Sequence, residues 1–165
     1  ELRGRRPVIA VVKVGTSSIT DDDGSLDRGA ISKVCAELVE ALAEAGAIPK
    51  KSVEDVTKAI VAREAQATTG IGKGVALPHA KLKGIKKPIG TIGRSSDGID
   101  FSSLDAKPVY SVILLLSSPE NPDEHLQAME TIFKHVQRDI FRKFLRQSQT
   151  KEAVVDLIHE ADELG

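Results

Sequence analysis

The stretch TTGIGKGVALPHA, residues 68–80, places three glycines within five residues and a proline directly before a histidine. Glycine adopts positive φ without strain and lets another backbone or an anion approach closely. Pro78 fixes its own φ and restricts Leu77 to extended backbone, so the chain reaches His79 in a rigid conformation. A neutral imidazole is a nucleophile near physiological pH. The stretch therefore indicates a histidine that can accept a phosphoryl group. The alternative is an ordinary histidine after a glycine turn.

The composition limits the class of protein. A chain of 165 residues suits one domain with a core of its own. Lys and Arg total 23 against 24 Asp and Glu, and this balance argues against nucleic-acid binding, which normally requires a basic excess. The single cysteine excludes an internal disulfide and a cysteine zinc site. Because only 3% of the residues are aromatic, we expect an aliphatic core.

Membrane insertion is not expected. The longest apolar stretch, residues 109–116, is eight residues long, which is too short to cross a bilayer. A secretory signal is not predicted either, because Lys13 interrupts the apolar run that follows Arg5 and Arg6. We therefore expect a cytoplasmic protein.

The hydrophobic pattern predicts alternating strands and helices. Asp27 and Gly46 are the expected ends of the first helix, and Ser52 with Asp55 is expected to cap the second. Phe101 is expected to lie beneath a loop at 98–106. We expect strands at 7–14, 89–94 and 109–116, and helices at 27–45, 52–66, from about 123, 140–145 and 150–164. This order predicts an α/β sandwich, a single domain over residues 1–165, with a central sheet flanked by helices.

The glycine–histidine stretch resembles a known signature, G-I-G-x-G-x-A-x-P-H. This signature surrounds the active histidine in enzyme IIA domains of the bacterial sugar phosphotransferase system, in the fructose, mannitol and nitrogen-regulatory branch. The resemblance covers about residues 31–165 and implies a mixed central sheet. The matching residues are Gly70, Ile71, Gly72, Gly74, Ala76, Pro78 and His79.

The resemblance implies the residues of a phosphoryl-transfer site. His79 would attack through Nε2 while a backbone carbonyl holds Nδ1–H. Arg63, in an Arg–Glu pair before the glycines, and His125, in a Glu-His-Leu pattern after a buried strand, would donate to the phosphoryl oxygens. Position alone would make both of them ordinary surface residues. Further donors would come from Thr68, Thr69, Gly70 and Gly72.

The resemblance also implies two protein partners. A phosphohistidine carrier protein would donate the phosphoryl group, and a cysteine of an enzyme IIB domain would accept it during sugar uptake. A nitrogen-regulatory protein would use the same histidine for signalling. Transfer between histidine and cysteine side chains needs no metal ion, and we expect neither a metal nor another cofactor.

The N-terminal segment, about residues 1–30, carries a second resemblance. VVKVGTSSITDDDGSLDR, residues 11–28, is similar to the start of glutamate 5-kinases, where such a strand and loop bind ATP phosphates. Kinase activity is not predicted, because the later motifs of that family are missing. The matching residues are Lys13, Gly15, Thr16 and Ser17.

Two resemblances in one chain suggest an engineered chimera, joined within the helix at 30–46. A chance or natural resemblance is the alternative. The function that follows is that of a phosphocarrier. A fragment of an amino-acid kinase, or an inactive scaffold that keeps the fold, are the competing interpretations.

Overall fold

The apolar run VYSVILLL, residues 109–116, forms a strand, as predicted, and this strand lies at the centre of the sheet. In the computed structural model, which describes residues 9–13 and 28–163, it is strand β6, Val109–Ser117. β6 pairs with β5, Ile89–Ile99, in antiparallel orientation and with β3, Val75–Ala76, in parallel. The short strand β4, His79–Lys81, also pairs with β6 in parallel. A central position buries both faces of β6, which explains why its apolar residues do not alternate with polar ones.

The remaining strands complete a mixed sheet of order β1-β5-β6-β3-β2. β1, Ile9–Lys13, pairs in parallel with β5, and β2, Gly70–Gly72, pairs antiparallel with β3. The other elements are α1 (Arg28–Glu44), the 3₁₀ turn η1 (Lys50–Ser52), α2 (Val53–Gln66), α3 (Pro122–Val136), α4 (Asp139–Gln147) and α5 (Lys151–Glu163).

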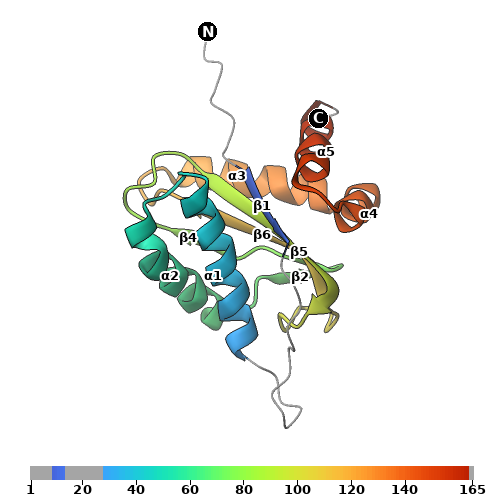
Figure 1. Ribbon diagram of the computed structural model, residues 1–165, viewed down its shortest axis with the longest axis horizontal. Helices are drawn as coiled ribbons and strands as arrows, with labels where there is room; N and C mark the ends of the chain where they lie inside the picture. Colours follow the sequence, from blue (N-terminus) through green and yellow to red (C-terminus); the bar gives the residue numbers. More distant parts are fainter. Residues whose placement is uncertain (1–8, 14–27, 164–165) are drawn as a thin grey trace.

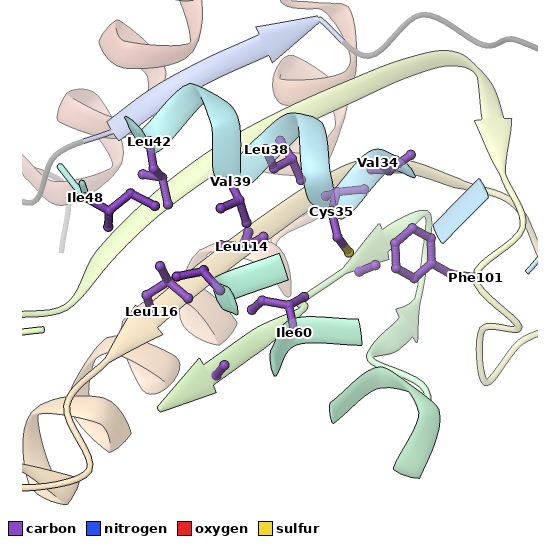
Figure 2. Close-up of a cluster of buried hydrophobic side chains, with 14 of the residues drawn as sticks. Val34, Cys35, Leu38, Val39, Leu42, Ile48, Ile60, Phe101, Leu114 and Leu116 are labelled. Atoms are coloured by element: carbon purple, nitrogen blue, oxygen red, sulfur yellow. The ribbon is translucent and has the colours of Figure 1, made fainter. Parts of the chain in front are cut away.

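Helices cover the two faces of this sheet (Figure 1), α1 and α2 on one side and α3 on the other. Alternate side chains of β6 pack on the two faces of the sheet. Leu114 and Leu116 pack with α1 and α2, where Leu38 and Ile60 are fully buried (Figure 2), and Ile113 packs in the cluster that includes residues of α3, α4 and α5. The chain is thus the single α/β domain, with a mixed sheet flanked by helices, that the sequence predicts.

The structure corrects three local predictions. The stretch at 70–76, where no hairpin is predicted from the sequence, forms the β2–β3 hairpin. β5 continues to Ile99, beyond the predicted end at residue 94. The Ser52 hydroxyl donates to the Pro49 carbonyl oxygen at 2.7 Å and makes no cap on α2.

Two other expectations are confirmed. Gly46 follows α1 with φ of +75°, a conformation that lets glycine end a helix. Phe101 is 1% exposed, as expected for a side chain beneath its loop.

The expectations about residues 14–27 lie outside the described residues. These are the helix cap at Asp27 and the kinase-like Gly15, Thr16 and Ser17. The side chain of Lys13 also lies outside what is described. Within the kinase-like segment 1–30, the structure describes the backbone of β1 and the start of α1.

Candidate functional site

Strand pairing fixes the position of His79. The Leu115 N–H donates to the Pro78 carbonyl oxygen at 3.0 Å, and His79 lies opposite Leu115 in the β4–β6 register. His79 Nδ1 lies 2.7 Å from the Leu77 carbonyl oxygen. A carbonyl only accepts hydrogen bonds, so this contact requires a proton on Nδ1. Nε2 then carries the lone pair, as a nucleophile must.

His125 lies beside His79. It occupies the first turn of α3, and its ring centroid is 5.7 Å from that of His79. His125 is 7% exposed, and its Nδ1 is 2.6 Å from the Ser117 hydroxyl at the end of β6. Burial lowers the pKa of His125, and the charges of Lys81 and His79 lower it further. β4 and the end of β6 therefore bring together the two histidines predicted from the sequence.

Arg63 lies near the C-terminal end of α2, a helix that packs against β4. One guanidinium nitrogen donates to the Ala67 carbonyl oxygen at 3.1 Å. A guanidinium has five N–H groups, so this contact leaves donors for a phosphoryl group.

The four remaining predicted residues lie in or next to the β2–β3 hairpin. The Thr68 hydroxyl donates to the Phe101 carbonyl oxygen at 2.7 Å, and the Gly70 N–H donates to Thr68 Oγ1 at 3.1 Å. Both the N–H and the hydroxyl of Thr69 donate to the Glu64 carboxylate. The donors of Thr68, Thr69 and Gly70 are thus occupied within the protein, and phosphoryl binding by these three residues and Gly72 stays a prediction.

Packing accounts for two of the glycines. A Cβ on Gly70 would lie 2.9 Å from Ser103 Cα, closer than real Cβ atoms come to backbone. Gly72 has φ of +93° and lies against the Asp105 carboxylate. Both glycines let the 102–105 loop pack against the hairpin.

Glu64 was missed by sequence reasoning. Its carboxylate joins the end of α2 to the start of the hairpin through Thr69. The Arg-Glu pair before the glycines was the available signal, but spacing along the chain does not show which side chain turns toward the hairpin.

A metal site is not found among residues 9–13 and 28–163, where no three His, Cys, Asp or Glu side chains could hold one ion. No described helix is long and apolar enough to cross a membrane. Burial raises the pKa of the Cys35 thiol to about 12, so this cysteine is unreactive near neutral pH.

Residues 25–161 match the family model described as "Phosphoenolpyruvate-dependent sugar phosphotransferase system, EIIA 2". The chain is 34% identical over 126 residues to the fructose-specific EIIABC component of Bacillus subtilis, covering 76% of this chain and 20% of that protein. It is 33% identical over 105 residues to the fructose-specific EIIA component of Haloferax volcanii, covering 64% of this chain and 68% of that one. The chain therefore spans about a fifth of the first relative.

A solved structure has the same fold. The nitrogen regulatory protein IIA-Ntr of Neisseria meningitidis superposes with a TM-score of 0.70 at 25% identity, over 90% of both chains.

The lowered pKa of His125 predicts how stability depends on pH. Between the folded-state pKa and the ordinary value of 6.5, the unfolded chain binds more protons at His125 than the folded chain does. The lowered pKa of His125 therefore makes a stabilising contribution to the free energy of unfolding. This contribution is fully present above pH 6.5 and is lost as the pH falls through the folded-state pKa. An NMR titration of the histidine ring protons should give His125 a midpoint below 6.5.

His125→Gln supplies the matched control. Its free energy of unfolding, measured in urea, should fall less between pH 7 and pH 5 than that of the unchanged protein. A His125 midpoint at or above 6.5 would contradict the prediction.

Proposed function

Because this chain belongs to the EIIA 2 family of the phosphoenolpyruvate-dependent sugar phosphotransferase system, we propose that it is a phosphocarrier that accepts the phosphoryl group on His79. The donor is a phosphohistidine carrier protein, and the acceptor of the next step is a cysteine of an enzyme IIB domain in sugar uptake. The observation that carries the proposal is the contact of His79 Nδ1 with the Leu77 carbonyl oxygen, because it presents Nε2 as the nucleophile. A cytoplasmic location is part of the proposal.

The first step exchanges one phosphorus–nitrogen bond for another. The lone pair of His79 Nε2 forms a bond to phosphorus while the bond to the donor histidine breaks and its electron pair returns to the donor nitrogen. The His79 ring gains positive charge but keeps its Nδ1 proton. The Leu77 carbonyl stabilises that charge, because hydrogen bonds from charged donors are stronger than those from neutral ones.

The transition state carries its charge on the equatorial phosphoryl oxygens, so nearby donors stabilise it. We assign this role to His125, whose ring lies beside that of His79, and to Arg63. In the second step a cysteine thiolate attacks phosphorus, the bond to Nε2 breaks, and His79 recovers its lone pair.

A nitrogen-regulatory role is the second candidate. The superposition on the Neisseria meningitidis nitrogen regulatory protein favours it. The fructose-specific relatives favour sugar transport. Both roles use the same chemistry at His79. An assay for phosphoryl transfer to a IIB domain distinguishes them, because only the sugar-transport role includes that step.

The two-parent origin of the chain also remains a proposal. The family match begins at residue 25, and the resemblance to glutamate 5-kinases covers about residues 1–30, so the two overlap at their junction. If the N-terminal segment blocks docking of the donor, the chain is an inactive scaffold with an intact site.

Incubation with phosphoenolpyruvate, enzyme I and the histidine carrier protein tests the acceptor. Intact-mass spectrometry should show one acid-labile phosphoryl group on the protein and none on His79→Ala. His159→Ala, which removes a histidine on α5, is the matched control and should be phosphorylated normally.

Two results would contradict the proposal. One is a phosphoryl group on His79→Ala. The other is a folded, unmodified protein under conditions that phosphorylate a fructose-specific IIA domain, and this second result favours the scaffold.

Replacing Arg63 tests its role in transfer. Arg63→Ala should slow phosphoryl transfer about a hundredfold to a thousandfold, since losing one aligned donor typically has effects of this size. Its circular dichroism spectrum should be unchanged. Lys58→Ala, a change on the same helix of an exposed lysine paired with Glu54, is the control and should transfer at the normal rate. Equal rates for the two variants would remove Arg63 from the mechanism.

A further inference from the structure

A basic cleft lies near the opposite end of β6 from the two histidines. Its volume is about 710 Å³, and Tyr110 and Ser111 of β6 form part of its wall. Ser117, which contacts His125, is six residues further along the strand, or roughly 20 Å at the rise of an extended chain. The cleft is therefore separate from the phosphoryl-transfer site.

The first wall of the cleft carries two exposed lysines whose backbone N–H groups bind one carboxylate. Lys73 lies at the tip of the β2–β3 hairpin, and Lys107 lies in the loop before β6. The Asp105 carboxylate accepts the backbone N–H of Lys73 at 2.9 Å and that of Lys107 at 3.1 Å. These bonds, that of Lys73 first, lower the pKa of Asp105. The only carboxylate among the described lining residues thus accepts two backbone N–H groups, and it holds the backbone of both lysines at the cleft.

The second wall is α4, which contributes Arg142, Lys143 and Arg146. The Arg146 guanidinium carbon lies 3.6 Å from the centroid of the Tyr110 ring. This cation–π contact holds the side chain against the wall of the cleft. Arg142 is anchored by the Val136 carbonyl oxygen and by Asp139, which neutralises part of its charge. Lys143 is exposed.

Arg94 adds a positive charge behind this wall. It lies on β5 opposite Ser111, and its guanidinium donates to the Arg146 carbonyl oxygen. Its Nε is buried and has no hydrogen-bond partner among the described residues. Asp105 is the only acidic residue among the described residues that line the cleft. None of the described ion pairs neutralises the four basic side chains, which are those of Lys73, Lys107, Lys143 and Arg146.

We propose that this cleft binds a small polyanion that bears phosphate groups, such as an organic di- or triphosphate. Lysine and arginine side chains on two facing walls match several phosphate charges, and arginine suits phosphate oxygens geometrically. A concave volume of about 710 Å³ is typical of small-molecule sites. None of these residues takes part in the transfer proposed at His79, so the site is additional to that function.

Calorimetric titration with inorganic pyrophosphate and with ATP at low ionic strength tests the proposal. Each should bind the protein once. Lys107→Glu/Lys143→Glu should weaken binding about tenfold or more, because two attractive charges become repulsive. Lys50→Glu/Lys51→Glu makes the same charge change at two exposed residues of η1 and should leave binding unchanged. Arg63→Ala should also bind normally, which excludes the phosphoryl-transfer site as the place of binding.

Three outcomes would overturn the proposal. The unchanged protein could fail to bind either probe. The two double variants, each folded by circular dichroism, could lose binding equally, which would indicate a nonspecific charge effect. A polyglutamate peptide could bind where pyrophosphate and ATP do not, and the cleft would then be a surface for an acidic protein. Equal affinity for pyrophosphate and ATP supports recognition of phosphate alone, and tighter ATP binding supports an additional contact with the nucleoside.

Discussion

The site depends on the hydrogen bond between His79 Nδ1 and the Leu77 carbonyl oxygen. Three constraints fix that carbonyl. The Leu77 N–H donates to the Thr69 carbonyl oxygen at 2.9 Å, the Leu77 side chain is 1% exposed in the core, and the following Pro78 carbonyl accepts the Leu115 N–H. The carbonyl cannot turn away without breaking core packing or strand pairing. The imidazole is therefore held as one tautomer, with its proton on Nδ1 and its free lone pair on Nε2.

Strand β6 relates this constraint to the rest of the molecule. Its C-terminal half pairs with β4, which carries His79, and its last residue contacts His125. Its N-terminal half pairs with β3 and forms a wall of the basic cleft. The β2–β3 hairpin joins the two regions, because Lys73 at its tip is six residues before His79. The two histidines and the basic cleft therefore both border this one buried strand, near its opposite ends.

Much of the fold follows from the sequence because its signals are local. The apolar run at 109–116 has the length and composition of a strand buried on both faces, and Gly46 ends a helix where a positive φ is needed. The hairpin was missed because strands of two and three residues have no measurable periodicity. The extension of β5 was missed because Ser95, Ser96, Asp97 and Gly98 are residues typical of turns.

The site was less accessible from the sequence than the fold. Pro78 and the glycines mark His79 in the sequence, whereas only the family resemblance indicates Arg63 and His125. The contact of Glu64 with Thr69 depends on how the chain turns from α2 into the hairpin, and the walls of the basic cleft depend on tertiary packing. In the cleft, Lys73, Lys107 and Arg146 come from segments far apart in the chain, and no local pattern brings them together.

The most direct test of this account is to identify the phosphorylated nitrogen of His79. Heteronuclear NMR of the ¹⁵N-histidine-labelled phosphoprotein resolves phosphorus–nitrogen coupling at each ring nitrogen. The hydrogen bond to Leu77 predicts phosphorus on Nε2 with the proton retained on Nδ1. Phosphorus on Nδ1 would mean that the ring leaves the Leu77 carbonyl to react, and would contradict the claim that this contact selects the nucleophile.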